Sequence, residues 1–256
     1  MLISAFSAAR SRPDRNDSNP VHAHSGVPLR CLSPRLRASA VRFWAALFIL
    51  ACATASAQPR LHYSKSFPGS VPAFVDITLE KSGDGLYREA VDDDNPLKFK
   101  LAESETAAIF DLVPKLDYFK RSLDSNLKVA FMGMKTFQWE DGGKKTEAKF
   151  NYSEDATART LADWFERITE SELHYIDLER AAKYDKLGVL KALLQLESAM
   201  DRKRLVAATQ YLPLLDRIIK NESYMHAART RASGIAEAIR GGGAPAPGAP
   251  AATPAP

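Results

Sequence analysis

Apolar and polar residues alternate in short runs between residues 74 and 152, the period of a β-strand with one buried face. Residues 75–79 read Val-Asp-Ile-Thr-Leu, and a second run covers residues 86–91. The Lys-Ser-Gly-Asp-Gly segment between them predicts a turn, because glycine readily adopts the positive φ that hairpins need. A second hairpin is expected from residues 127–139 and 144–152, with Gly133 marking a bulge that resets the strand register.

The stretch 150–168, FNYSEDATARTLADWFERI, predicts a strand that runs directly into an amphipathic helix. Phe150 and Tyr152 flank a polar residue, as strand periodicity requires. Ser153 is a suitable N-cap, because its hydroxyl can accept a hydrogen bond from a first-turn amide. The helix then carries one apolar stripe: Leu161, Trp164, Phe165 and Ile168. We expect Trp164 to be a large core residue on this stripe.

Residues 97–116 repeat this pattern about fifty positions earlier. Phe99 and Leu101 correspond to Phe150 and Tyr152. A matching stripe follows, at Ile109, Leu112, Val113 and Leu116. This similarity predicts a structural pseudo-repeat, although two unrelated strand–helix junctions can share such a pattern. Pro114 is expected to interrupt the first helix, over residues 104–120, because proline removes a backbone donor.

After residue 172 the pattern is helical to residue 240. Strong helix formers cover 189–200, and further helices are expected at 211–219, with Pro213 in the first turn, and at 224–240. The fold class is therefore α+β: a small antiparallel sheet of four or five strands, formed by two strand-strand-helix units, with helices 104–120 and 154–171 on one face and a C-terminal helical layer. We expect one domain over 74–240, with the sheet–helix repeat at 74–172 and the helical part at 173–240.

Both ends of the chain differ in composition from this domain. Residues 58–73 contain three prolines and predict an extended arm, and the Gly-, Ala- and Pro-rich segment 241–256 predicts a disordered tail. Residues 1–57 indicate a signal peptide: arginines precede an apolar run at 43–53, and Ala-Ser-Ala at 55–57 matches a cleavage site. We therefore expect export to the periplasm or the medium after cleavage near Ala57, with a lipoprotein anchored at Cys52 as the alternative.

Removing this leader changes the charge and the cysteine content. The chain has 35 Lys+Arg and 31 Asp+Glu, of which 7 Arg and 2 Asp lie in residues 1–57. The remaining chain is nearly neutral, which argues against a nucleic-acid partner. Cys31 and Cys52 both lie in the leader, so disulfides, a thiol nucleophile and Cys-ligated zinc are excluded after cleavage. We also expect no integral membrane span after processing.

Three histidines remain: His62, His174 and His226. His174 follows Glu170 by four residues, so the two side chains share a helix face, and Glu222 is spaced in the same way from His226. A metal site would need a third ligand, and no zinc-protease spacing is present, so no metal or other cofactor is expected. A carboxylate–histidine pair on a helix surface explains the spacing better.

Other candidate sites are weaker. The densest run of hydrogen-bonding side chains in the helical part comprises Tyr224, His226, Arg229 and Arg231, which helix packing also explains. Tyr224, His226 and Arg229 form the candidate polar cluster with His174 and Glu170. Lys135 and Thr136 beside Trp139 could line a cleft. Residues 92–94, three successive aspartates, fit a solvated turn better than a calcium loop.

Several longer stretches carry a family resemblance: LKVAFMGMKTFQW, FNYSEDATARTLADWFERI, YDKLGVLKALLQLE and YLPLLDRIIKNESYMHAARTRA. They are similar to a family of exported bacterial proteins of unknown function, and the resemblance covers residues 61–240. The resemblance implies export and one compact unit, but it indicates no activity and no functional residues for this chain.

These observations favour an exported envelope or secreted protein that acts as a non-enzymatic binding module, because no phosphate-binding loop, dinucleotide fingerprint or serine nucleophile motif is present. The partner would be a protein or another envelope component. Two alternatives stay open: a metal-independent periplasmic hydrolase, and a structural or assembly factor of the envelope. A pocket with converging polar groups would favour an enzyme, and a broad apolar patch would favour the other two.

Overall fold

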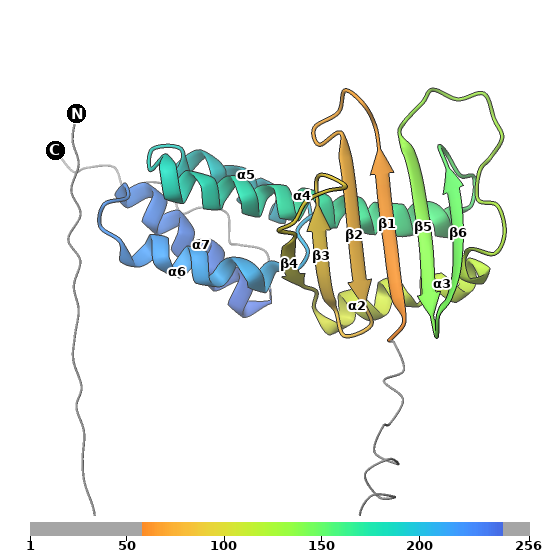
Figure 1. Cartoon of the computed structure of the whole chain (residues 1–256). Coiled ribbons are helices and arrows are strands. Elements are labelled where there is room, and N and C mark those ends of the chain that lie inside the picture. Colours follow the sequence, from red (N-terminus) through yellow and green to blue (C-terminus); the bar gives the residue numbers. More distant parts are fainter. Residues whose placement is uncertain (1–57, 243–256) are drawn as a thin grey trace, which may run out of the picture. The chain divides into compact units, whose positions relative to one another are not determined.

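The computed structural model describes residues 58–242, whose centre is a six-stranded antiparallel sheet in the order β4-β3-β2-β1-β5-β6 (Figure 1). The strands are β1 (Arg60–Ser66), β2 (Phe74–Glu80), β3 (Asp84–Arg88), β4 (Leu97–Lys100), β5 (Met134–Asp141) and β6 (Lys144–Phe150). With helices on one face and more helices after the sheet, the α+β class is confirmed. The predicted leader 1–57 and residues 243–256 of the predicted tail lie outside the described residues.

The first strand corrects the prediction of an extended arm at residues 58–73. β1 lies in the middle of the sheet and pairs with β2 on one side and β5 on the other, over its whole length. Leu61 and Tyr63 point into the core and are 0% and 1% exposed. The arm is therefore the strand that joins the two predicted hairpins, and it raises the strand count from the expected four or five to six.

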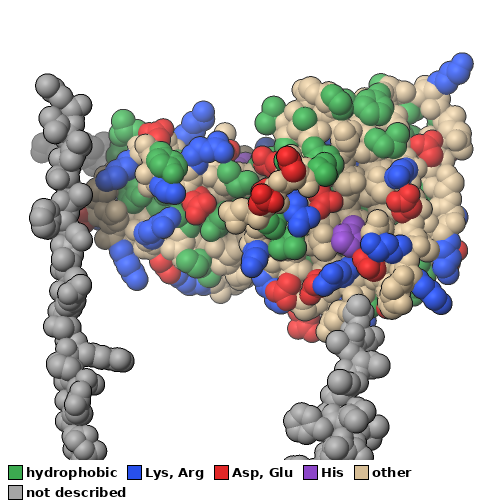
Figure 2. All heavy atoms as spheres, viewed as in Figure 1, with side chains coloured by type: hydrophobic (Ala, Val, Ile, Leu, Met, Phe, Trp, Pro, Cys, Tyr) green, Lys and Arg blue, Asp and Glu red, His purple; other side chains and the backbone are tan. Residues whose placement is uncertain are grey.

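The sheet has one covered and one open face. The alternation of Val75, Ile77 and Leu79 places all three in the core, as the pattern predicts. Figure 1 shows helices α2 (Glu103–Phe110), α3 (Leu112–Lys115) and α4 (Ala156–Tyr184) behind the sheet. The opposite face, seen in Figure 2, carries mixed basic and acidic side chains. Arg60–Glu80 is one of the ion pairs across neighbouring strands, with 3.1 Å between Nη2 and Oε1.

Pro114 interrupts the first helix, as expected. The predicted helix 104–120 is divided into α2, α3 and a 3-10 turn, η1 (Asp117–Phe119). Gly133 does not reset the register within a strand, because β5 begins only at Met134 and residues 127–133 form a loop. A Cβ on Gly133 would lie 2.9 Å from the Cβ of Phe67, and its φ is +91°, so the close approach of two loops requires glycine there.

Helix α4 begins two residues later than Ser153 suggests. The N-cap is Asp155, whose carboxylate accepts from the backbone N–H of Thr157 at 2.7 Å and Ala158 at 3.3 Å. The Ser153 hydroxyl instead accepts from the backbone N–H of Asp155 at 3.3 Å. The helix also continues unbroken past residue 171 to Tyr184, so it spans the boundary between the predicted sheet–helix part and helical part.

The two predicted stripes show the same burial pattern. In each stripe the first, third and fourth positions are buried and the second is partly buried. Phe99 and Phe150, which precede the stripes, are also buried, and they lie on β4 and β6, the two edge strands of the sheet. Trp164 holds the partly buried second position, so the expectation that it is a core residue is wrong. Its neighbour Phe165 is fully buried and stacks on Tyr63, with ring centroids 4.6 Å apart.

The C-terminal helices build a second core. They are α5 (Val189–Asp201), the 3-10 turn η2 (Ala208–Tyr211), α6 (Leu212–Lys220) and α7 (His226–Gly241), close to the predicted bounds. Pro213 lies in the first turn of α6, as predicted. Gly242 caps α7 with φ +68°, so the helix and its cap include the first two residues of the expected tail. None of the helices over residues 58–242 is long and apolar enough to cross a bilayer.

A buried polar layer on α4 separates the two cores. The first core includes Ile168 and the second begins at Leu178, while Ser171 and Glu172 between them are both 0% exposed. The Ser171 hydroxyl accepts from the backbone N–H of Val206 at 3.0 Å. From η2, Gln210 donates to the Glu172 carboxylate at 2.7 Å, and the Tyr211 hydroxyl donates to the Ser171 carbonyl. These hydrogen bonds fix η2 against α4, so one helix serves both cores.

Candidate functional site

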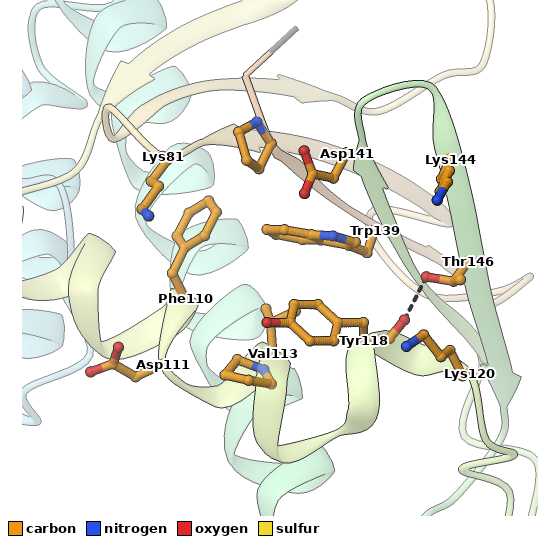
Figure 3. A pocket seen from close by; sticks show the side chains of 12 residues that line it. Lys81, Phe110, Asp111, Val113, Tyr118, Lys120, Trp139, Asp141, Lys144 and Thr146 are labelled. Carbon is orange, nitrogen blue, oxygen red and sulfur yellow. Dashed lines mark hydrogen bonds between the residues drawn. The ribbon is translucent and has the colours of Figure 1, made fainter. Parts of the chain in front are cut away.

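A pocket of about 560 Å³ opens at the end of the sheet where β1 begins (Figure 3). Five separate segments line it: Pro59, the β2–β3 turn at Lys81, the end of α2 with α3, η1, and the β5–β6 hairpin. Its volume lies within the range of small-molecule sites, which are mostly apolar clefts with a few polar groups. We therefore take this pocket as the candidate site.

Three aromatic side chains form the pocket wall. Trp139, from β5, packs edge-on against Phe110, with centroids 6.0 Å apart and rings inclined at 70°. The ring centroid of Tyr118 lies 5.7 Å from that of Trp139 (Figure 3). Such tilted pairs are favoured because the positive ring edge meets the negative ring face. Trp139 is only partly buried, so part of its ring is available to a ligand.

An unusual backbone turn presents Tyr118. Asp117, Tyr118 and Phe119 have φ values of +49°, +52° and +61°, a left-handed conformation that costs free energy for residues with a Cβ. This turn sends Phe119 into the core, where it stacks 5.3 Å from Phe137, and leaves Tyr118 38% exposed at the pocket. The Thr146 hydroxyl donates a hydrogen bond to the Tyr118 carbonyl, which holds the turn against β6 (Figure 3).

Charged groups surround the aromatic wall. Lys120 lies 5.6 Å from the Tyr118 ring centroid and 3.6 Å from the Asp117 carboxylate. Lys81, Lys144, Asp111 and Asp141 also line the pocket, and no ion pair involves them within residues 58–242. The rim can therefore bind polar substituents of both signs around an apolar ring.

The residues of the candidate polar cluster lie in two separate places, with Glu170 and His174 on α4 and the other three at or just before α7. Glu170 and His174 do share a face of α4, with 3.9 Å between Oε1 and Nε2. Burial lowers the pKa of His174, although Glu170 and Asp177 oppose that shift. Glu170 also accepts from Arg202 at 3.0 Å and from Arg204 at 2.9 Å. The pair is therefore part of the contact between α4 and the end of α5.

The other three residues of the cluster lie in the helical part. Tyr224 is buried and donates to the carbonyl of Ala182 at 2.7 Å, which is a packing role. His226 is exposed at the first position of α7, so Glu222 lies outside that helix and does not share a face with it. Arg229 is half-buried on α7. No group of three metal-ligating side chains occurs among the described residues.

A second open cavity, of about 410 Å³, lies beside Glu170 and His174. His174, Glu170 and Asp177 line it together with the β1–β2 loop and Gln195 of α5. It has no aromatic wall, and its carboxylate Glu170 is already held by two arginines. This cavity is therefore the weaker of the two candidates.

His62, the third histidine, lies on the open face of the sheet. Its Nδ1 is 3.0 Å from the Thr78 hydroxyl and its Nε2 is 3.6 Å from Glu140. Burial lowers the pKa of His62, while the carboxylates of Asp76 and Glu140 act against that shift. The Thr78 hydrogen bond and the Glu140 contact hold the imidazole between β2 and β5 and give it a structural role.

Sequence reasoning missed most of the pocket residues, because they come from positions far apart in the chain. Trp139 was noted beside Lys135 and Thr136, yet neither of these two lines this pocket. One signal was present in the sequence: Phe110 lies off the apolar stripe of its own helix. A large aromatic on the polar side of an amphipathic helix is a reason to look for a second contact surface.

Comparison with models of protein families and with curated proteins gave no match for this chain.

Proposed function

We propose that this protein is an exported, non-enzymatic binding module that holds a small ring-bearing molecule in the pocket of Trp139, Tyr118 and Phe110. The observation that carries the proposal is the aromatic wall with Tyr118 held in a left-handed turn. Backbone strain of this kind costs free energy, and it is retained in proteins mainly where surrounding structure enforces it. Here it positions one exposed aromatic side chain opposite another.

The ligand class follows from the wall and the rim. A flat or CH-rich ring gains free energy by stacking on Trp139 and Tyr118, because aromatic faces carry negative partial charge and large apolar area. Lys81 and Lys144 supply donors, and Asp111 and Asp141 supply acceptors at the edge. The matching ligand is a ring compound with polar or charged groups at its periphery.

Export rests on the leader pattern at residues 1–57, and the partner environment would then be the cell envelope or the medium. The hydrolase alternative would place its chemistry at Glu170 and His174. Two guanidinium groups already bind that carboxylate, which favours a role in holding α5 to α4. Binding without turnover is therefore the better supported function.

Tryptophan fluorescence provides the test. The Trp164→Phe variant keeps Trp139 as the reporter in residues 58–256, and it is titrated with aromatic carboxylates, nucleosides and disaccharides. At least one of these classes should change the emission of Trp139 saturably. Tyr118→Ala should weaken that binding by about tenfold, because one stacking contact is lost.

Tyr184→Ala is the matched control, because Tyr184 is an exposed tyrosine, 74% accessible, at the end of α4. It should bind the same compound with unchanged affinity. A loss of affinity equal to that of Tyr118→Ala, or no saturable change with any class, would contradict the pocket assignment. Conversion of the bound compound, seen by mass spectrometry, would contradict the non-enzymatic role.

A further inference from the structure

Two apolar loops meet at the end of the sheet opposite the pocket. The β1–β2 loop covers residues 67–73, and the second loop, residues 124–133, leads into β5. Their strands end together, since Ser66 pairs with both Phe74 and Met134. The rings of Phe67 and Phe131 pack edge-on, with 5.8 Å between their centroids, so the two loops are in contact. We call the surface formed by residues 67–73 and 124–134 the loop surface.

Large apolar side chains on the loop surface point to solvent. Val71 is 94% exposed and Phe131 is 54% exposed. Four more are at least 40% exposed on the second loop and the strand after it: Leu127, Val129, Met132 and Met134. Soluble proteins rarely expose so many adjacent apolar groups without a binding role.

Hydrogen bonds within the first loop, and from Asn151 to the second loop, hold the two loops in this conformation. Asn151 accepts from the backbone N–H of Met132 at 2.8 Å and donates to the carbonyl of Ala130 at 3.0 Å. In the first loop, the Ser70 hydroxyl lies 2.7 Å from the carbonyls of both Phe67 and Pro72. These bonds satisfy several backbone polar groups internally, which is what entry into an apolar medium requires.

The charges also favour one kind of partner. Residues 66–75 contain no ionisable side chain, and residues 125–134 contain only Lys128. Asp124, at the base of the second loop, is half-buried and accepts from the backbone N–H groups of Asn126 at 2.8 Å and Asn151 at 2.9 Å. The surface therefore combines apolar side chains on two loops with one cation, Lys128, and its one carboxylate, Asp124, is hydrogen-bonded to backbone amides at the base of the second loop. That combination matches the interface of a bilayer with anionic headgroups.

We propose that the loop surface inserts into the interfacial region of an anionic lipid bilayer, with Val71 and Phe131 among the acyl chains and Lys128 at the headgroups. The pocket, at the opposite end of the strands, then faces away from the membrane. This proposal does not depend on the function proposed for the pocket.

Vesicle co-sedimentation tests the proposal with the full chain as purified from cells. The probes are vesicles of phosphatidylethanolamine with phosphatidylglycerol, and vesicles of phosphatidylcholine alone. The chain should bind the first type more strongly, and Lys128→Gln should reduce that binding by about fivefold. The double variant Val71→Asp with Phe131→Asp should bind at least about tenfold more weakly, because both apolar anchors are lost.

Leu187→Asp with Leu194→Asp is the matched control, because both leucines are exposed on the helical part, 75% and 46% accessible. The variants and the wild type share the same N-terminal sequence, so differences between them report on the substituted positions. Far-UV circular dichroism and thermal midpoints should be unchanged, since all four positions are exposed.

Equal vesicle binding by wild type and the Val71/Phe131 variant would overturn the proposal. So would an equal loss of binding in the Leu187/Leu194 control. Sedimentation velocity supplies the alternative outcome: if vesicles do not bind and the wild type associates with rising concentration while the Val71/Phe131 variant does not, the loop surface is a protein–protein contact.

Discussion

Adjacent aromatic residues on α4 have opposite roles. Phe165 is fully buried and stacks on Tyr63, whereas Trp164 is partly buried beneath the guanidinium of Arg167, 4.3 Å from its ring centroid. Residues next to each other on a helix point about 100° apart, so a stripe that contains both cannot rank them. The sequence identifies the apolar face, and only the packing of the sheet decides which ring lies at its centre.

Substitution by alanine should separate the two rings. Phe165→Ala should lower the free energy of unfolding by about 3–5 kcal/mol, as deletion of a large buried aromatic does. Trp164→Ala should cost only about 1 kcal/mol, mainly the lost contact with Arg167. Urea titration followed by circular dichroism measures both, and a cost for Trp164→Ala as large as that for Phe165→Ala would contradict this ranking.

At the scale of the element, the turn after α5 shows how a short connection places Arg204 against Glu170, the partner of His174 on α4. Lys203 adopts φ +56°, and its N–H binds the carbonyl of Met200 while the N–H of Arg204 binds Ala199. This is the Schellman arrangement, in which glycine usually holds the left-handed position. It directs Arg204 back to α4, where its guanidinium contacts Glu170 and Asp163.

Lys203→Gly should therefore stabilise the protein by about 0.5–1 kcal/mol, because glycine adopts positive φ without the steric cost that a Cβ brings. Lys203 is exposed, so the substitution removes no buried contact. Differential scanning calorimetry of both proteins is the measurement, with Lys191→Gly inside α5 as the destabilising control. A lower midpoint for Lys203→Gly would show that the turn carries no strain.

Helices and strands could be predicted where the apolar pattern continues over many residues, but not where a polar residue interrupts it. The buried stripes of α2–α4, the β2–β3 hairpin and α5–α7 follow directly from spacing. β1 was missed because Lys65 and Lys135 hold inward positions, paired with each other across β1 and β5, so the alternation stops after Tyr63. Lys65 reaches Glu166 at 3.3 Å, a partner 101 residues away that no local pattern can reveal.

The candidate site was predictable to a smaller extent. Its residues come from five segments that only the fold brings together. The left-handed turn at residues 117–119 contains no glycine, so the sequence gives no signal of positive φ there. Glu170 and His174 were correctly placed on one helix face. Their arginine partners, at the far end of α5, depend on the packing of α5 against α4.

At the scale of the whole molecule, the polar layer between the two cores makes stability depend on pH. Glu172 is fully buried in that layer, with one donor, Gln210 Nε2, at 2.7 Å. Burial raises the pKa of Glu172 from 4.5 to about 7, although the hydrogen bond from Gln210 opposes that shift. The folded state therefore holds the proton more tightly than the unfolded chain does. This contribution to stability is complete below pH 4.5 and is lost as the pH rises through about 7.

Glu172→Gln should remove this dependence, since the amide is uncharged and can still accept from Gln210. Relative to wild type, the variant should gain about 3 kcal/mol in free energy of unfolding between pH 4.5 and pH 8. Urea titrations at both pH values measure the difference. Glu179→Gln, an exposed position on the same helix, should change little. A constant difference between Glu172→Gln and wild type would mean that Glu172 is ionised in the folded protein.

The position of β1 also sets an order of assembly. Arg60 pairs with Glu140, 80 residues later, so the second edge of the central strand stays unpaired until β5 has been synthesised or delivered. Until then, β1 and β2 can form only a local hairpin. The outer strands β4 and β6 carry lysines, which discourage pairing with other chains, whereas β1 has Arg60 and Lys65 near its two ends and no charged side chain among residues 61–64 between them. A chain halted before residue 134 would therefore expose its central strand as a template for domain swapping or for capture by a chaperone.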